Sequence, residues 1–147
     1  FKLPEILFFF ILLQISFGAL VSGLNAAQIY QTWPLMGQNY FPDDSQLLDL
    51  LSLQSFENPS IVQFIHRNLA YLILFIFSLT AFLVLKNKDY FYLRKNVILI
   101  FFALFFQIFL GILTILSGAQ IILASMHQIG SIFLITTAIM LTYKNFN

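Results

Sequence analysis

The chain has 147 residues, a formal net charge of +1, and 60% hydrophobic but only 9% charged residues. This composition excludes a water-soluble domain, because so few polar residues cannot cover a surface that faces water. The near-neutral charge excludes nucleic acid as a partner, and the absence of cysteine excludes disulfides, thiolate metal sites and iron–sulfur clusters.

Four apolar segments follow one another along the chain, and each is long enough to cross a hydrocarbon core of about 30 Å. They lie near residues 4–26, 61–85, 97–118 and 120–142. Lipid offers no hydrogen-bond partner to the backbone, so each segment is predicted to be a helix. The first segment is too long for the apolar region of a signal peptide and lacks a cleavage site. The sequence therefore predicts an all-α fold, with residues 1–147 forming a single transmembrane four-helix bundle.

Charged residues outside the spans indicate the orientation of the bundle. Basic residues gather at the two ends of the chain and in the second connection, at Lys2, Lys86, Lys88, Arg94, Lys95 and Lys144. Because basic residues favour the cytoplasmic face, both termini are expected on the cytoplasmic or matrix side. The membrane is expected to be a bacterial inner membrane or the equivalent mitochondrial inner membrane.

The first connection, residues 27–60, is an acidic outer loop without Lys or Arg. Its prolines and turn-forming residues favour ordered surface structure, with one short amphipathic helix around residues 45–54. At the end of the loop, Asn58 is a good N-cap and Pro59 suits the first helical position. The second span is therefore predicted to begin here.

A short internal repeat links the first and third spans. The pattern Gln-Ile-x-x-Gly occurs at residues 14–18 and again at residues 107–111, and the span after each copy contains one of the two histidines, His66 and His127. We interpret the chain as two tandem helix-pair repeats related by an axis along the membrane normal. The helical rise places the histidines at similar depths, ~9 and ~12 Å below the outer ends of their spans.

Two histidines at one depth favour a shared ligand, since ionisable residues within a membrane usually mark functional sites. The structural alternative is a histidine bonded to a neighbouring carbonyl or glutamine. Zinc and copper sites require three or four protein ligands. A haem supplies four equatorial nitrogens itself and requires one or two axial side chains. The pair therefore predicts a b-type haem with His66 and His127 as its axial iron ligands.

Small residues near the histidines indicate room for a flat macrocycle. Ala124, Gly130 and Ser131 lie within one turn of His127, and Ala70 lies one turn after His66. Two stripes with helical spacing on the first and third spans agree with this: Gln107, Gly111, Thr114 and Gly118 in the third span and Gln14, Gly18, Val21 and Asn25 in the first. Close packing of helices is the alternative role for such small residues.

Three further residues are candidates for binding the cofactor: Arg67, Gln63 and Gln128. Arg67 is the only cation inside a span, and its guanidinium either pairs with a haem propionate or reaches the headgroups. The two glutamines either orient an imidazole or meet a propionate. No catalytic residue is assigned, because the chain contains neither a Ser-His-Asp arrangement nor a glycine-rich phosphate loop.

Several motifs, in this order, resemble the C-terminal half of the haem A synthase family in its alphaproteobacterial and mitochondrial branch. They are Gly18 to Ala26, Thr32 to Gly37, Glu57-Asn58, Gln63 to Arg67, Gln107 to Gly111 and Ala124 to Gln128. The resemblance implies an eight-span protein of two four-helix bundles that oxidises the C8 methyl of haem O to the formyl of haem A. It also implies a role in cytochrome oxidase assembly and a haem b held by His66 and His127.

Two departures from this family affect the expected function. The N-terminal bundle, which in the family carries the substrate haem and a catalytic glutamate, is absent, and the chain begins with Phe1 rather than Met. The chain is therefore expected to be a fragment, one part of a split protein or a decayed copy. At Asn25 the family pattern has Asp, a difference of expected mild effect.

The expected partners are membrane lipid, the missing N-terminal half or its separate chain, and haem O synthase, with haem O as the substrate of the complete enzyme. Two alternatives remain open at this point. One is a small bis-His cytochrome b subunit that transfers electrons to another membrane protein. The other is an inactive fragment that only inserts or associates with a partner bundle.

Overall fold

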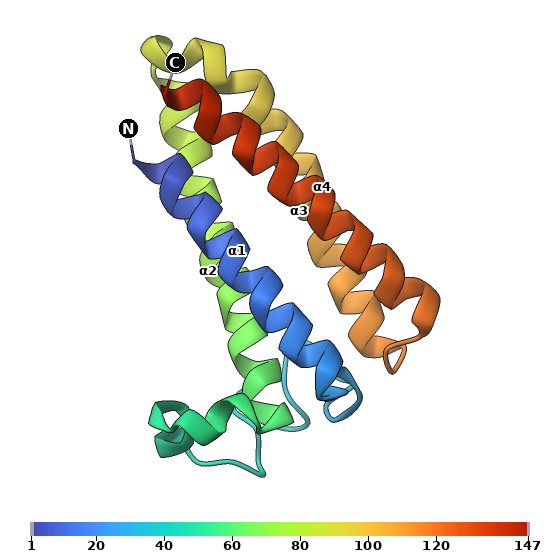
Figure 1. The fold of residues 1–147 in the computed structure, drawn as a ribbon. Helices are drawn as coiled ribbons and strands as arrows, with labels where there is room; N and C mark the ends of the chain where they lie inside the picture. The colour runs from blue at the N-terminus through green and yellow to red at the C-terminus, as the bar shows by residue number, and fades with distance from the viewer. Residues whose placement is uncertain (1, 147) are drawn as a thin grey trace.

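The computed structural model describes residues 2–146, in which four long α-helices form a bundle (Figure 1). The helices are α1 (Leu3–Gly23), α2 (Pro59–Lys86), α3 (Arg94–Leu116) and α4 (Ile121–Phe146). Helices this long and apolar can cross a membrane. The predicted all-α membrane bundle is confirmed, and the chain is an integral membrane protein.

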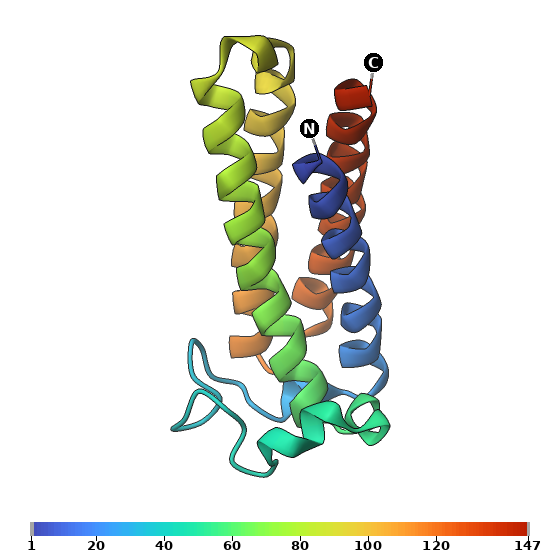
Figure 2. The same ribbon diagram turned by 90° about the vertical axis from the view of Figure 1, so that its left-hand side faces the viewer.

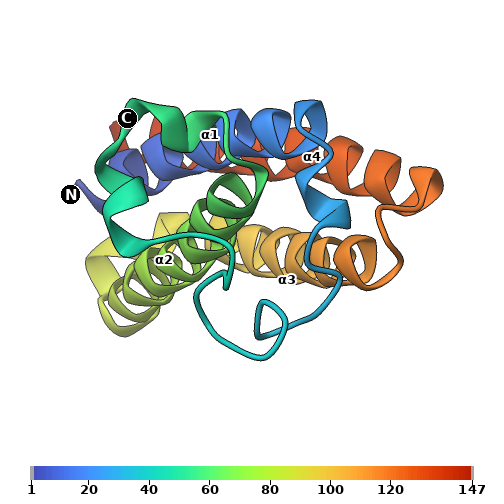
Figure 3. The ribbon, with the colours of Figure 1, turned by 90° about the horizontal axis from the view of Figure 1, so that it is seen from below.

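The helices form two antiparallel pairs. α1 packs mainly on α2 and α3 mainly on α4, and the pairs meet where α1 contacts α4 and α2 contacts α3 (Figures 2 and 3). The described ends of the chain and the 3-10 helix η4 (Lys88–Leu93) lie at one end of the bundle, and the outer loop lies at the other (Figure 1). The basic residues of both termini and of the second connection therefore share one end.

Local sequence explains where these helices begin and end. The Asn58 side chain accepts hydrogen bonds from the backbone nitrogens of Ser60 and Ile61, which confirms the predicted N-cap of α2. α1 ends at Gly23, three residues before the predicted limit, because Asn25 has a left-handed conformation with φ of 51°. Asparagine adopts this conformation more readily than most residues. Its side chain thus suits the turn that leaves α1.

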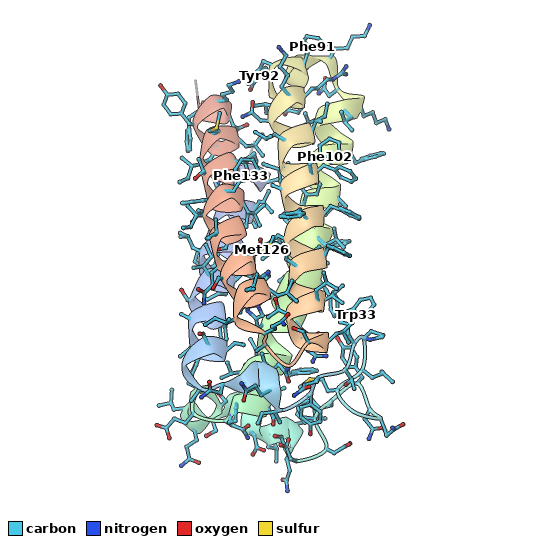
Figure 4. The ribbon with its side chains drawn as sticks, turned by 90° about the vertical axis from the view of Figure 1, so that its right-hand side faces the viewer. Trp33, Phe91, Tyr92, Phe102, Met126 and Phe133 are labelled. Atoms are coloured by element: carbon cyan, nitrogen blue, oxygen red, sulfur yellow. The ribbon has the colours of Figure 1, made fainter. Side chains whose placement is uncertain are left out.

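The apolar core fills the half of the bundle that contains the chain ends. Leu7 from α1, Phe77 from α2, Val97 from α3 and Leu141 from α4 are buried together there. Phe102 and Phe133 instead point outward from α3 and α4 (Figure 4). The outward faces of the helices are therefore apolar surfaces that contact lipid.

The outer loop contains three short 3-10 helices, η1 (Ala26–Gln28), η2 (Leu47–Leu51) and η3 (Leu53–Phe56). The prediction of a single amphipathic helix at residues 45–54 is wrong. Ser52 has an extended backbone with φ of −90° and ψ of 144°, which separates η2 from η3. The Ser52 hydroxyl then accepts a hydrogen bond from the Gln54 nitrogen and caps the second turn.

Candidate functional site

The outer half of the bundle contains a partly open cavity of about 250 Å³. All four helices contribute to its walls, and Trp33 of the outer loop reaches it from outside the membrane-spanning helices. Most of the lining is apolar. Its polar side chains come from Gln14, Gln63, His66, Arg67, Tyr71, Gln107, Thr114, His127 and Ser131. Both predicted axial histidines therefore face one cavity.

His66 projects from α2 toward one face of α1. The side-chain nitrogen of Gln14 donates to the His66 backbone oxygen at 3.0 Å and lies 3.3 Å from the His66 ring nitrogen Nε2. One turn further along α1, a Cβ atom at Gly18 would lie 3.3 Å from His66 Cε1. The Gln14 and Gly18 positions are four residues apart, so they share a helix face and together position the imidazole.

His127 has the same surroundings in the second helix pair. The side-chain nitrogen of Gln107 on α3 donates to the His127 backbone oxygen at 2.7 Å. A Cβ atom at Gly111 would lie 3.0 Å from His127 Cε1. A Cβ atom at Gly130 of α4 would overlap the Gln107 side-chain oxygen. Gly111 and Gly130 thus allow the imidazole and the amide to lie between α3 and α4.

The Gln-Ile-x-x-Gly repeat therefore has one structural role in both pairs. In each pair, the glutamine bonds the main chain of the histidine and the glycine leaves space for its ring. His66 lies seven residues after Pro59 and His127 six residues after Ile121, so both are ~10 Å from the outer starts of α2 and α4. Their depths match, as the sequence predicts.

Several buried polar atoms at this cavity have no hydrogen-bond partner within residues 2–146. They are Nδ1 of His66 and His127, Oε1 of Gln14, Gln63 and Gln107, and Nε of Arg67. A buried polar atom without a partner costs roughly 1–3 kcal/mol. These atoms therefore require partners other than the protein groups around them, such as ordered water or a bound ligand.

The donor set limits which ligand fits. Among the described residues, no three side chains of His, Cys, Asp or Glu gather at one point. Two imidazoles are too few for a structural zinc or copper site built from protein ligands. Two is the number of side-chain ligands needed by a macrocycle that fills the equatorial plane itself.

Arg67 fixes the outer loop above the cavity. Its Nη1 donates to the backbone oxygens of Thr32 at 2.8 Å and Leu35 at 3.2 Å, and its Nη2 donates to that of Tyr30 at 2.9 Å. The side chain is only 6% exposed and is therefore shielded by the protein around it. Gln63 also donates to the Tyr30 oxygen, at 3.0 Å. Both side chains hold the segment that carries Trp33.

Local geometry within the loop explains why this segment suits Arg67. The Thr32 hydroxyl donates to the Leu35 oxygen and accepts from the Gly37 nitrogen, each at 2.8 Å. Gly37 has φ of +74°, a conformation that favours glycine. The Tyr30 hydroxyl accepts from the Asp43 nitrogen at 3.1 Å. Burial and then the charge of Asp44 raise the pKa of Tyr30.

Gln128 lies outside this arrangement. Its side chain is exposed and does not line the cavity, because neighbouring helical residues point about 100° apart and His127 points inward. Gln14 and Gln107 lie at the site in its place. The sequence signal for them is the internal repeat, which places each one four residues before the glycine that faces a histidine.

Replacing Gln107 with methionine is expected to lower the free energy of unfolding by about 0.5–1.5 kcal/mol, because a buried hydrogen bond between α3 and α4 is lost. The matched change of Gln14 is expected to act similarly on α1 and α2. Equilibrium unfolding in mixed micelles measures both losses. Gln128→Met is the control and should cause no loss of stability. An equal loss in all three variants would contradict a stabilising role for the Gln14 and Gln107 hydrogen bonds.

Comparison with known proteins places the chain in a family. Residues 3–139 match the cytochrome oxidase assembly protein family. The chain is 45% identical to heme A synthase of Pelagibacter ubique over 150 residues, which cover 99% of this chain and 44% of that protein. It is 43% identical to heme A synthase of Bartonella tribocorum, over 80% of this chain and 33% of that protein.

The heme A synthase of Wolbachia sp. subsp. Brugia malayi is 43% identical, over 88% of this chain and 36% of that protein. No solved structure matches the chain. The chain spans less than half the length of these curated relatives. These matches show that the chain belongs to the cytochrome oxidase assembly protein family.

Proposed function

We propose that this chain forms the haem b-binding part of a haem A synthase. The observation that carries the proposal is the pair of histidines, each with its own glutamine and glycine on the neighbouring helix, facing one cavity from opposite helix pairs. His66 and His127 would be the axial ligands. When bound, the haem supplies a one-electron redox centre within the membrane.

The surrounding residues fit this cofactor in their chemistry. Gln14 and Gln107 fix the two histidine-bearing helices, and the apolar walls exclude water from the metal site. The Nε atom of Arg67 is buried and has no hydrogen-bond partner, so it is the atom that would donate a hydrogen bond to a haem propionate. The cavity volume of about 250 Å³ is below the roughly 300–1,000 Å³ of small-molecule sites, so binding of a macrocycle would require the helix pairs to move apart.

The larger reaction belongs to a longer protein. We infer that the chain corresponds to the C-terminal half of an enzyme that oxidises the C8 methyl of haem O to a formyl group. The N-terminal half of such an enzyme, on the same chain or on a separate one, would hold the substrate haem. In this arrangement our chain takes part in electron transfer from haem O, and it does not complete the reaction by itself.

Reconstitution of the purified chain with haem b tests the cofactor assignment. One haem per chain is expected, with the absorption and electron paramagnetic resonance spectra of a low-spin bis-histidine haem. A high-spin spectrum, or binding that is not stoichiometric, would contradict the proposal.

Deletion of the coding sequence in the source cell distinguishes the synthase from a small cytochrome b subunit. Both roles use the same pair of axial histidines, but only the synthase is required to make haem A. Loss of haem A from the membranes, restored by the wild-type sequence, supports the synthase. Unchanged haem A together with a defect in electron transfer supports the cytochrome b subunit.

A further inference from the structure

A cluster of exposed apolar side chains lies on the outer loop, outside the bundle. Leu47, Leu48, Leu51 and Leu53 are between 69% and 87% exposed, and Phe56 is 45% exposed. They all belong to residues 47–56, the two short helices η2 and η3, which we call the leucine turn. Exposed leucines this close together are unusual on a surface that faces water and mark an interaction surface.

The position of the leucine turn relative to α1 indicates the membrane boundary. The ring of Phe56 packs on that of Phe17, with 5.9 Å between their centroids. Phe17 lies six residues before Gly23, the outer end of α1, and hence ~9 Å inside that membrane-spanning helix. The turn therefore lies beside α1 at the outer end of the bundle (Figure 2).

The backbone of the leucine turn is largely paired within the turn itself. The nitrogens of Asp49, Ser52, Ser55 and Glu57 donate to the oxygens three residues earlier. The Asp49 carboxylate accepts from the Gln46 nitrogen at 2.7 Å. Internal pairing of this kind allows a backbone segment to enter an apolar medium at low cost.

Polar contacts join the segments before and after the leucine turn. The Ser60 hydroxyl donates to the Asp44 carboxylate at 2.6 Å, and the Asn58 amide donates to the Ser45 hydroxyl at 3.3 Å. These contacts attach the loop to the start of α2 and leave the leucines free. Residues 27–60 contain no Lys or Arg, so nothing in the loop attracts anionic headgroups. A zwitterionic lipid surface suits this charge.

We propose that the leucine turn inserts into the outer leaflet and anchors the loop to the membrane interface. Its leucines replace water contacts with acyl-chain contacts, as in other helical segments that lie in the interface plane. The anchor holds the same loop that Arg67 fixes over the cavity. This proposal does not depend on the identity of the ligand in the cavity.

Spin labelling in phosphatidylcholine vesicles tests the proposal. The chain has no cysteine, so Leu51→Cys and Leu53→Cys each give a single labelling site. The Gln38→Cys variant is the aqueous control because Gln38 is an exposed loop residue, and Phe102→Cys is the lipid control because Phe102 is 64% exposed on α3. Circular dichroism checks that each labelled protein keeps its helices.

Labels at residues 51 and 53 are expected to collide more often with oxygen than with a water-soluble nickel chelate, as the label at 102 does. The label at 38 should show the reverse order. An aqueous pattern at 51 and 53 would overturn the proposal. Protection from both reagents would also overturn it, because the turn would then be covered by protein.

Discussion

Replacing His66 or His127 with alanine is expected to convert a low-spin haem into a five-coordinate, high-spin one. The iron would keep a single axial ligand, and the other position would face an enlarged apolar space. Removing a group that only hydrogen-bonds a metal ligand weakens metal binding about 10–100-fold. Removing the ligand itself should therefore weaken haem binding by at least the same factor. Replacing both histidines is expected to abolish stoichiometric binding.

Absorption spectra and the haem-to-protein ratio after reconstitution measure this effect. Gln128→Ala is the matched control, because Gln128 neighbours His127 on α4 but is exposed outside the cavity. It should keep the wild-type spectrum and stoichiometry. If the double histidine variant kept the low-spin spectrum, the axial ligands would have to be other residues.

Replacing Arg67 with methionine is expected to lower the free energy of unfolding by about 2–4 kcal/mol. Hydrogen bonds to charged groups contribute about 1.5–3 kcal/mol each, and part of this loss is recovered when other donors take over. The Tyr30 backbone oxygen still accepts a hydrogen bond from the Gln63 side chain, and the Leu35 backbone oxygen still accepts one from the Thr32 hydroxyl. The Thr32 oxygen loses the one partner recorded for it within the described chain.

Unfolding in mixed micelles measures this loss, and limited proteolysis reports whether residues 30–36 become accessible. Arg67→Lys should restore only part of the stability, because an ammonium group cannot reproduce the planar fork of the guanidinium. Arg94→Met is the control, since Arg94 donates to the backbone oxygen of Leu85 at 2.8 Å at the opposite end of the bundle. Loop protection that survives in Arg67→Met would contradict the role of Arg67.

The sequence identifies His66, His127 and Arg67 as candidate site residues. It explains the role of the histidines better than that of Arg67. The histidines stand out because they are ionisable, they occur in matched spans and a short repeat precedes each one. Arg67 also stands out as the one cation inside a span. Its contacts, however, join residues 32 to 37 positions apart, and no local pattern specifies contacts at such separations.

The four spans followed from the sequence because lipid leaves the backbone no hydrogen-bond partner other than its own helix, so length and hydropathy are sufficient. The N-cap at Asn58 followed for a similar reason, since the cap is made within three residues. The single helix at residues 45–54 did not form, because at Ser52 the local side-chain cap of a second turn competes successfully with helix propagation.

Only the tertiary structure decided which face of each helix meets its neighbours. Helix rotation is set by packing along the whole length of a pair, and it turned Gln14 and Gln107 toward the histidines while Gln128 turned outward. Hydropathy carries little information about this choice in a membrane, where the outside is as apolar as the core. The sequence by itself therefore determined the spans and the paired histidines, and the packing of the helices determined the residues that hold them in place.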